Sequence, residues 1–513
     1  MKKERTNNKP NQTRELLLTS SLNENVSKLK AHLEPCDDLI FHTIPFKSRN
    51  SCFVYLSNMV DSQRLYEIER SLLETFQKEE PAYAESMNAY VSRQFPFHSV
   101  SESKDGLPVI EGILSGKAVL LIDKSETVVY FDLLSSVGRE VSEPDVDRTV
   151  MGPKEGFVEK LETNLHLIRK RLRTPSLKVE QLILGKETRT QISILYVKGI
   201  ASEGLVKEVQ ERLGRIDIDG VIAGQYLESM ISDAPFSPFP TMINTDRPDR
   251  VTAELLEGKV AILTDGDPLA LLAPVTFVEF LHSTDDYYTT SLIATFVRWV
   301  RFLGLFVALI LPAFFVAVTS FHQDLLQTPF LIRIAANRAN LPYPSVVEGL
   351  FMYLTYELLR EAGLRMPKIF GGPLLTLLGL IFISQAGVNA GVIGPVMSIA
   401  VSTTALTAFI VSDYNFHQVI RFSGIPLLLL AGMFGFMGIL IGLMFGLAHL
   451  VSLRSFGVPY FSPVSPARKK GWKDVFIRAP WWAMDTRPPG LDVGNLGRSD
   501  DTRPPSPPKV EED

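Results

Sequence analysis

The chain has 513 residues and a formal net charge of −5, which allows two or three domains and argues against nucleic acid as a partner. Its two cysteines are too few for a disulfide framework and favour a domain that faces the cytosol. The histidines show no metal-ligand spacing, and the Gly-Lys pairs lack the upstream glycine of a phosphate-binding loop. We therefore expect no metal, no cofactor and no enzymatic activity.

The two ends of the chain differ in composition from the part between them. Residues 1–35 begin with charged side chains that no apolar core follows, so the segment is not a signal peptide. Residues 490–513 are polar and rich in proline. Because such segments bury little apolar surface, we expect both to be disordered.

Two stretches of the front part match one another at an offset of about 141 residues. Each contains an apolar strand with a tyrosine (Tyr55 or Tyr196), then a charged amphipathic helix and, farther on, a Gly-Lys turn before a buried strand. This pattern predicts an internal duplication. We expect two related α/β subdomains, which span residues 36–135 and 176–290.

Residues 136–175 join these subdomains as a charged linker with a helix predicted over 156–173. The helix ends in a basic run, and two interpretations stay open. The cations could stabilise the negative end of the helix dipole, or they could contact another subunit or acidic lipid. The run consists of Arg169, Lys170, Arg171 and Arg173.

Apolar runs dominate residues 291–455, where we expect a helical transmembrane domain. The first clear span is 302–318, and Arg298 and Arg301 before it indicate that the soluble part lies on the cytoplasmic side. The last clear span is 426–450. It carries three glycines at four-residue spacing, which would let another helix approach closely. They are Gly438, Gly442 and Gly446.

Three more candidate spans, 346–359, 373–386 and 395–411, bring the total to five, whereas basic residues beyond both ends require an even number. One segment must therefore be re-entrant, interfacial or part of a long tilted element. Two placements fit 346–359, the membrane interface and the inside of a bundle. Two placements also fit the aromatic tail at 456–489, the membrane surface and a neighbouring domain.

The apolar block 372–411 is too long for one crossing and polar at its centre. Pro395 predicts a break at Gly394 or just before it. Polar side chains at this depth are costly unless they face protein or water, so the block is either a packing kink or part of an ion path. The candidate pore-lining residues are Gln385, Val388, Asn389, Val392, Ser398 and Ser402.

Several short strings follow one another in order over residues 36–489. They are Glu180-Gln181-Leu182, Pro238-Phe239-Pro240-Thr241, Asp246-Arg247-Pro248-Asp249, Arg360-Glu361-Ala362-Gly363, Gln385-Ala386-Gly387-Val388-Asn389, Ser412-Asp413-Tyr414-Asn415 and Ile477-Arg478-Ala479-Pro480-Trp481-Trp482, with Glu357 before the fourth. Together they resemble the A-subunits of bacterial spore germinant receptors, the GerA family.

The resemblance implies a multi-pass protein of the inner membrane of endospores, with its soluble part on the core side and membrane lipid around its helices. It implies a homo-oligomer, proposed to be a pentamer, that forms a nutrient-gated cation channel. The implied partners are a transporter-like B-subunit, thought to hold the nutrient, and a lipoprotein C-subunit. Where an acidic residue is common in the family this chain has Asn389, which puts its cation selectivity in doubt.

Other functions stay open beside the channel. A secondary transporter would need an inverted membrane repeat, and the sequence shows a duplication only in its soluble part. A non-conducting assembly or signalling scaffold, or an accessory paralogue of the same family, would need no pore. The expected fold is thus α+β with an α-helical membrane part: two related α/β cytoplasmic subdomains followed by a helical transmembrane domain.

Overall fold

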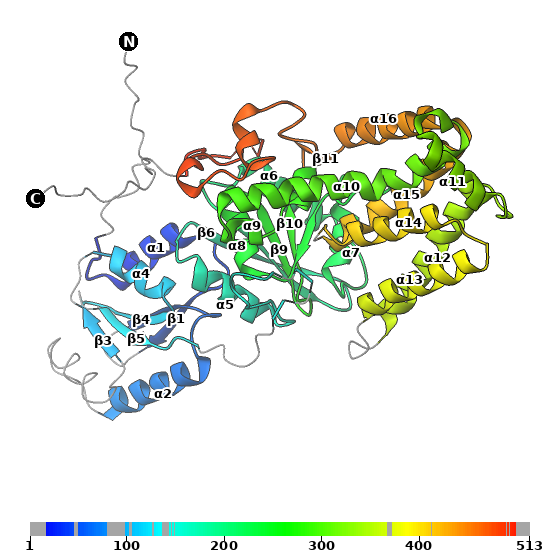
Figure 1. Cartoon of the computed structure of the whole chain (residues 1–513). Coiled ribbons are helices and arrows are strands. Elements are labelled where there is room, and N and C mark those ends of the chain that lie inside the picture. The colour runs from blue at the N-terminus through cyan, green and yellow to red at the C-terminus, as the bar shows by residue number, and fades with distance from the viewer. Residues whose placement is uncertain are drawn as a thin grey trace, which may run out of the picture.

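The structure, a computed structural model, places two α/β subdomains beside a set of long helices (Figure 1). One helix, α10, begins at the second subdomain and runs into the helical region. The residues described are 17–45, 50–78, 98–101, 105–125, 128–135, 143–144, 146–147, 149–366, 372–411, 413–488, 490–491 and 493–498.

The first subdomain is built on a five-stranded antiparallel sheet with the strand order β1-β2-β4-β5-β3. Helices α1 and α4 cover one face of the sheet and α2 covers the other, so its central strands are apolar on both faces. The elements are α1 (Leu22–Leu33), β1 (Leu39–Pro45), β2 (Asn50–Leu56), α2 (Ser62–Lys78), β3 (His98–Ser101), α4 (Leu107–Leu114), β4 (Lys117–Ile122) and β5 (Val128–Asp132).

The second subdomain repeats this arrangement with the order β6-β7-β9-β10-β8, which is the first order with every number raised by five. Helices α5 and α8 cover one face and α6 and α7 the other. The predicted duplication is therefore confirmed. The elements are α5 (Leu161–Arg171), β6 (Leu177–Leu184), β7 (Thr190–Val197), α6 (Glu203–Gly214), α7 (Gly224–Ile231), β8 (Ile243–Thr245), α8 (Pro248–Glu257), β9 (Val260–Thr264) and β10 (Ala270–Ala273).

The matching Gly-Lys turns hold equivalent places in the two copies. Gly116 and Gly258 both follow a helix and precede an inner strand, with φ of 86° and 100°. A positive φ suits glycine, since a side chain would clash with the backbone in this conformation. In both copies the glycine therefore lets the chain turn from a helix into an inner strand.

The expectation of disorder over residues 1–35 is wrong for its second half. Helix α1 places Leu22, Leu29 and Leu33 in the core of the first sheet. These leucines lie on one face of a helix whose other residues are mostly polar, and sequence reasoning overlooked this spacing. Residues 1–16 lie outside the described residues.

The basic run at the end of α5 has partners that neither interpretation foresaw. Arg169 is buried and donates to both carboxylate oxygens of Asp38, at 2.9 Å each, in the first subdomain. Lys170 and Arg171 both pair with Glu155. Arg169 therefore joins the two subdomains. A contact with acidic lipid is not needed to explain the charges of Arg169, Lys170 and Arg171.

The second subdomain continues into η1 (Phe277–Leu281), α9 (Asp285–Tyr288) and the helical region. Helix α12 packs against α13, α14 and α15, so the segment 346–359 lies within a helix bundle. The helices are α10 (Ser291–Ser320), η2 (Gln323–Leu325), α11 (Thr328–Arg338), α12 (Ser345–Arg365), α13 (Gly372–Asn389), α14 (Pro395–Ala408), α15 (Tyr414–Phe434) and α16 (Phe436–Ser452).

The prediction of one continuous span over 426–450 is wrong. Gly435 adopts φ 59° and ψ −137° and separates α15 from α16. By length and composition, two of the described helices, α10 and α15, could cross a membrane, while α13, α14 and α16 contain shorter apolar stretches.

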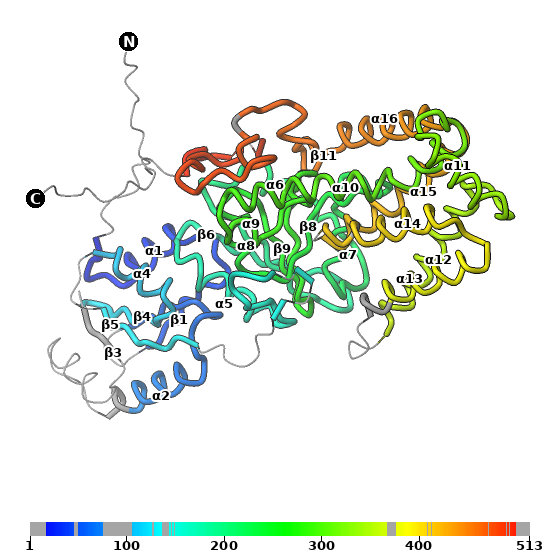
Figure 2. The backbone as a smooth tube through the Cα atoms, viewed as in Figure 1, coloured from blue at the N-terminus to red at the C-terminus, as the bar shows by residue number. Residues whose placement is uncertain are grey.

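The aromatic tail lies against the second subdomain and the start of α10, as Figure 2 shows. Phe476 stacks on Trp299, with ring centroids 5.9 Å apart, and Trp481 lies beside Tyr287. Docking on a neighbouring domain is therefore the placement observed. The tail elements are β11 (Arg454–Ser455), β12 (Val458–Pro459), η4 (Lys469–Asp474) and η5 (Trp481–Ala483).

The expectation of disorder beyond residue 489 also needs correction. Thr486 pairs with Gly497 in an isolated β-bridge, and the guanidinium of Arg487 donates to the carbonyls of Leu256, Asn495 and Gly497. Residues 490–491 and 493–498 are therefore part of the folded tail. Residues 499–513 lie outside the described residues.

Candidate functional site

The polar block separates into two helices at the predicted place. Helix α13 ends at Asn389, and Gly394 is the N-cap of α14, with Pro395 in its first turn. The buried carboxylate of Glu348 accepts a hydrogen bond from the Gly394 amide. A carboxylate at a helix N-terminus is favourable, because unpaired amides and the helix dipole both point at it. Glu348 of α12 therefore helps to hold the corner between α13 and α14.

The candidate pore residues do not meet in one place within the chain. Gln385 and Asn389 are exposed one turn apart on α13, and Gln385 Nε2 donates to Asn389 Oδ1 at 3.2 Å. Ser398 instead faces α13, where it bonds to Ser384. The half-buried members are Val388, Val392, Ser398 and Ser402.

The exposed amides of α13 lie on an apolar surface. Ile381 is 52% exposed and Phe382 71%. A polar pair inside such a surface needs a polar neighbour or water if the surface is removed from bulk solvent. The arrangement can therefore serve either a contact between copies or a water-filled path.

Two of the three glycines of the last predicted span face α15. A side chain at Gly438 would collide with the Leu430 carbonyl, and one at Gly442 would press on Leu427 and Leu430. Gly446 has open space around it. Two of the three glycines thus allow the close packing of α16 on α15 that follows the break at Gly435.

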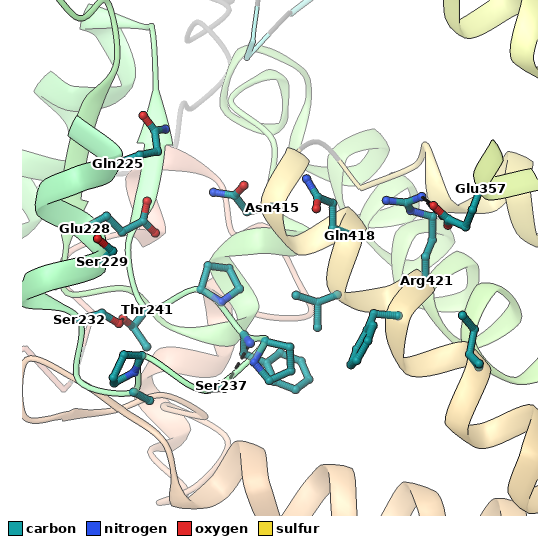
Figure 3. Close-up of a pocket in the computed structure, with 18 of the residues that line it drawn as sticks. Gln225, Glu228, Ser229, Ser232, Ser237, Thr241, Glu357, Asn415, Gln418 and Arg421 are labelled. Atoms are coloured by element: carbon teal, nitrogen blue, oxygen red, sulfur yellow. Dashed lines mark hydrogen bonds and ion pairs between the residues drawn. The ribbon is translucent and has the colours of Figure 1, made fainter. Parts of the chain in front are cut away.

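A cavity of about 810 Å³ opens between the second subdomain and the helical region (Figure 3). Helix α7 and the proline-rich segment 232–241 form one wall, and α15 and α12 form the other. The second wall carries Asn415 and Gln418 on α15 and, deeper along the same helix, Phe422 and Ile425. The cavity therefore has a polar end and an apolar end.

Two arginines share one carboxylate at the second wall. Arg421 Nη1 lies 2.6 and 2.8 Å from the two oxygens of Glu357, and Arg360 Nε lies 3.1 Å from Oε2. Arg421 is 5% exposed, and its Nε has no hydrogen-bond partner within the described part of the chain. Two guanidinium groups on one carboxylate leave a surplus positive charge and unused donors.

The first wall adds acidic and neutral polar groups. Glu228 accepts a hydrogen bond from Asn244 Nδ2 at 2.9 Å. Burial raises the pKa of the Glu228 carboxyl above its usual range, against the lowering effect of that hydrogen bond. Ser229 and Gln225 are exposed toward the cavity from the same helix. This wall can offer hydroxyl, amide and carboxyl groups to a ligand.

The arginines before the first predicted span are not free charges. Arg301 binds both oxygens of Asp286, at 2.7 and 2.8 Å, and Arg298 contacts Asp286 and Asp474, each at 3.0 Å. Because Arg298 and Asp286 are buried, these pairs join α10 to the subdomain and the tail. Arg298 and Arg301 therefore have a structural role within the chain, beside any role in orienting it across a membrane.

Sequence reasoning missed the cavity, although the signal was present. Three of the strings that carry the family resemblance contribute to its lining: the segment Pro238 to Thr241, Glu357 with Arg360, and Asn415. These strings lie far apart along the chain, and their convergence appears only in the folded molecule. No group of three His, Cys, Asp or Glu side chains in the described ranges is arranged to hold a metal.

These observations define a protein with a duplicated α/β part, a helical region with two candidate membrane spans, and a cavity between the two. The family model for the Bacillus/Clostridium GerA spore germination protein matches residues 27–489. Spore germination protein KA of Bacillus subtilis is 35% identical over 96% of this chain and 91% of its own length. Spore germination protein B1 of the same organism is 37% identical over 92% and 97%.

The chain therefore belongs to the GerA family of spore germination proteins. It is also similar to the uncharacterized membrane protein YfkQ of Bacillus subtilis, at 36% identity over 93% of each chain. Among solved structures, the N-terminal domain of the A subunit of the Bacillus megaterium spore germinant receptor GerK3 is 29% identical, with a TM-score of 0.41 over 51% of this chain and 97% of that one. The resemblance inferred from the strings is thus confirmed at the level of the family.

Proposed function

We propose that the chain is the membrane subunit of a nutrient germinant receptor, and that several copies form a nutrient-gated cation channel that triggers germination. Family membership over nearly the whole chain supports the first part. One observation carries the second: Gln385 and Asn389 form an exposed amide pair on an apolar face of α13. In a bilayer such a pair requires protein or water beside it.

In this proposal α13 faces the axis of a homo-oligomer in the inner spore membrane, with the α/β subdomains on the core side. Each copy contributes its amide pair to a polar ring, and half-buried Val388 and Val392 provide apolar positions near it that close the path by dewetting. A transporter-like B-subunit that holds the nutrient, and a lipoprotein C-subunit, are the expected partners. Binding there would shift the closed and open populations, and the chain itself performs no catalytic step.

The test is cation flux in liposomes that contain the full chain with its receptor partners. We expect Asn389→Trp to lower nutrient-triggered flux about tenfold by occluding the ring, and Asn389→Asp to raise the preference for cations over anions. The matched control is Asn340→Asp, because Asn340 is also an exposed asparagine, in the turn before α12. Unchanged flux and selectivity in both Asn389 variants, or a monomer in detergent, would contradict a pore at this position.

The competing functions make different predictions. A secondary transporter should take up substrate by itself, and in the described chain the repeated strand order is confined to the two sheets. A scaffold or an accessory paralogue should assemble without conducting, and Asn389→Trp should then change assembly and not flux.

A further inference from the structure

We infer that the cavity between α7 and α15 binds one acidic phospholipid, with a hydroxylated head group at its polar end and acyl chains along its apolar end. The inference rests on the proposed membrane location of α15. It assigns the cavity a ligand that is distinct from both the nutrient and the conducted ion.

The α15 wall has the polarity gradient of an amphiphile. Asn415, Gln418, Phe422 and Ile425 follow one another along one side of the helix at spacings of three and four residues. Over this stretch, about 15 Å at 1.5 Å per residue, the lining side chains change from amides, past Val419 and the cation of Arg421, to large apolar groups. A soluble metabolite would leave the apolar end unoccupied, whereas a lipid occupies both ends.

Two arginines of the same wall supply the hydrogen-bond donors that a phosphodiester requires. Arg360 and Arg421 share the single carboxylate of Glu357, so one positive charge is uncompensated there. Both arginines line the cavity, and Arg360 is the more accessible of the two, with 16% of its side chain exposed against 4% for Arg421. Arginine is well suited to phosphate because its planar guanidinium presents several donors at fixed angles. Basic pockets between membrane helices on the cytoplasmic side recognise lipid head groups in this way.

The opposite wall favours a head group that bears hydroxyls. Ser229, Gln225 and Glu228 line this wall from α7 with hydrogen-bonding groups and no cation (Figure 3). A glycerol head group can donate to the Glu228 carboxyl and to the amides. A choline head group has no donor for them.

The location of the cavity agrees with the depth of lipid head groups. Helix α15 begins at Tyr414, beside the second subdomain, and is one of the two described helices that are long and apolar enough to span a bilayer. Phe422 is 64% exposed, which leaves the apolar end open to acyl chains from the side.

The experiment measures lipid binding to the full chain by native mass spectrometry, with phosphatidylglycerol, phosphatidylcholine and free glycerol 3-phosphate as probes. We expect one phosphatidylglycerol per chain to be retained. Arg360→Gln should weaken this binding about tenfold by removing a charged donor, and Ser229→Trp should weaken it at least as much by filling the cavity.

Each variant has a matched control elsewhere in the chain. Arg365→Gln removes an exposed arginine of the same helix that also pairs with a glutamate, Glu361. Ser27→Trp enlarges an exposed helical serine that, like Ser229, bonds to a carbonyl of its own helix. Neither control should change the affinity for phosphatidylglycerol.

Three results would overturn the inference. These are equal binding of phosphatidylglycerol by the wild type and both cavity variants, binding of glycerol 3-phosphate as tight as that of the lipid, and crosslinking of Gln418→Cys to a neighbouring protein within the cavity. Extraction of each variant from membranes at alkaline pH and its cation flux are measured in parallel. A chain that stays in the membrane and conducts without retaining phosphatidylglycerol contradicts this inference alone, whereas a chain that is extracted contradicts the proposed function as well.

Discussion

The two α/β subdomains share one strand order and differ in what surrounds it. In the first copy, Lys117 is half-exposed and lies 5.9 Å from the ring centroid of Tyr130. In the second, the matching Lys259 is 2% exposed and pairs with Glu254 of α8 and Glu279 of η1. The chain after β10 covers the second sheet and brings Glu279 to the lysine. A repeated sequence therefore produces repeated topology, while later segments decide which charges become buried.

The largest effect is expected at the junction between the copies. Arg169→Met should destabilise the contact between α5 and the first subdomain by about 4 kcal/mol, because it leaves the buried Asp38 carboxylate without its partner. Arg171→Met, on the same helix and closer to solvent, should cost less than about 1 kcal/mol. Hydrogen exchange of β1 and β6 measures both. Equal protection in the two variants would show that the copies are held together elsewhere.

Lys117 and Lys259 hold equivalent places in the two copies, so replacing each of them tests whether burial alone distinguishes the copies. Lys259→Met should cost about 3 kcal/mol, since Glu254 and Glu279 then lose the cation that they share. Lys117→Met should cost about 0.5 kcal/mol, the value of an exposed cation–π contact. Thermal unfolding of the full chain in detergent, together with local hydrogen exchange at β9 and β4, separates the two. Similar losses would mean that the surroundings of the copies differ less than the structure indicates.

At the adjacent glycines we expect the copies to behave alike. Gly116→Ala and Gly258→Ala should each cost about 1–2 kcal/mol, because both positions have positive φ and an added Cβ would meet Leu134 or Val493. Hydrogen exchange at β4 and at β9 provides the measurement. A loss at only one glycine would break the equivalence of the turns.

The smallest effect is a pH dependence at the junction. His166 is buried on α5 with Nδ1 3.0 Å from the Asn58 carbonyl, and burial lowers its pKa below 6.5. The unfolded chain therefore binds a proton near pH 6.5 that the folded chain does not, so stability falls as the pH drops below that value. The loss should be at most about 1.4 kcal/mol per pH unit.

His166→Gln should flatten this dependence while keeping a donor for Asn58. The check is hydrogen exchange of α5 between pH 5.5 and 7.5, corrected for the intrinsic exchange rate. An unchanged slope in the variant would assign the pH dependence to other groups.

Local signals predicted much of the fold. Pro395 and the glycines before it marked the end of α13 and the start of α14, because a proline restricts the residue that precedes it. The offset between Tyr55 and Tyr196 revealed the duplication, since strand and turn patterns are read within a few residues. The break at Gly435 was missed, because an apolar run with isolated glycines also suits one continuous helix.

The candidate site was less accessible to sequence reasoning. The sequence allowed us to name candidate pore residues but not to say which way their side chains point. In the structure, Ser398 faces Ser384, whereas Gln385 and Asn389 face outward. The cavity is lined by Ser229, Glu357 and Gln418, which belong to three elements far apart in the sequence. No periodicity links such positions, because their proximity depends on how the subdomain packs against the helices.

The sequence by itself determined the two related subdomains, the helical region, the break in the polar block and the family, because these follow from short-range patterns and ordered strings. Only the tertiary structure decided that Arg169 is buried against Asp38, that Lys259 is buried while Lys117 is not, and that a cavity with two arginines separates α7 from α15. Burial and ion pairing arise where distant segments pack together, and that packing is a property of the folded chain as a whole.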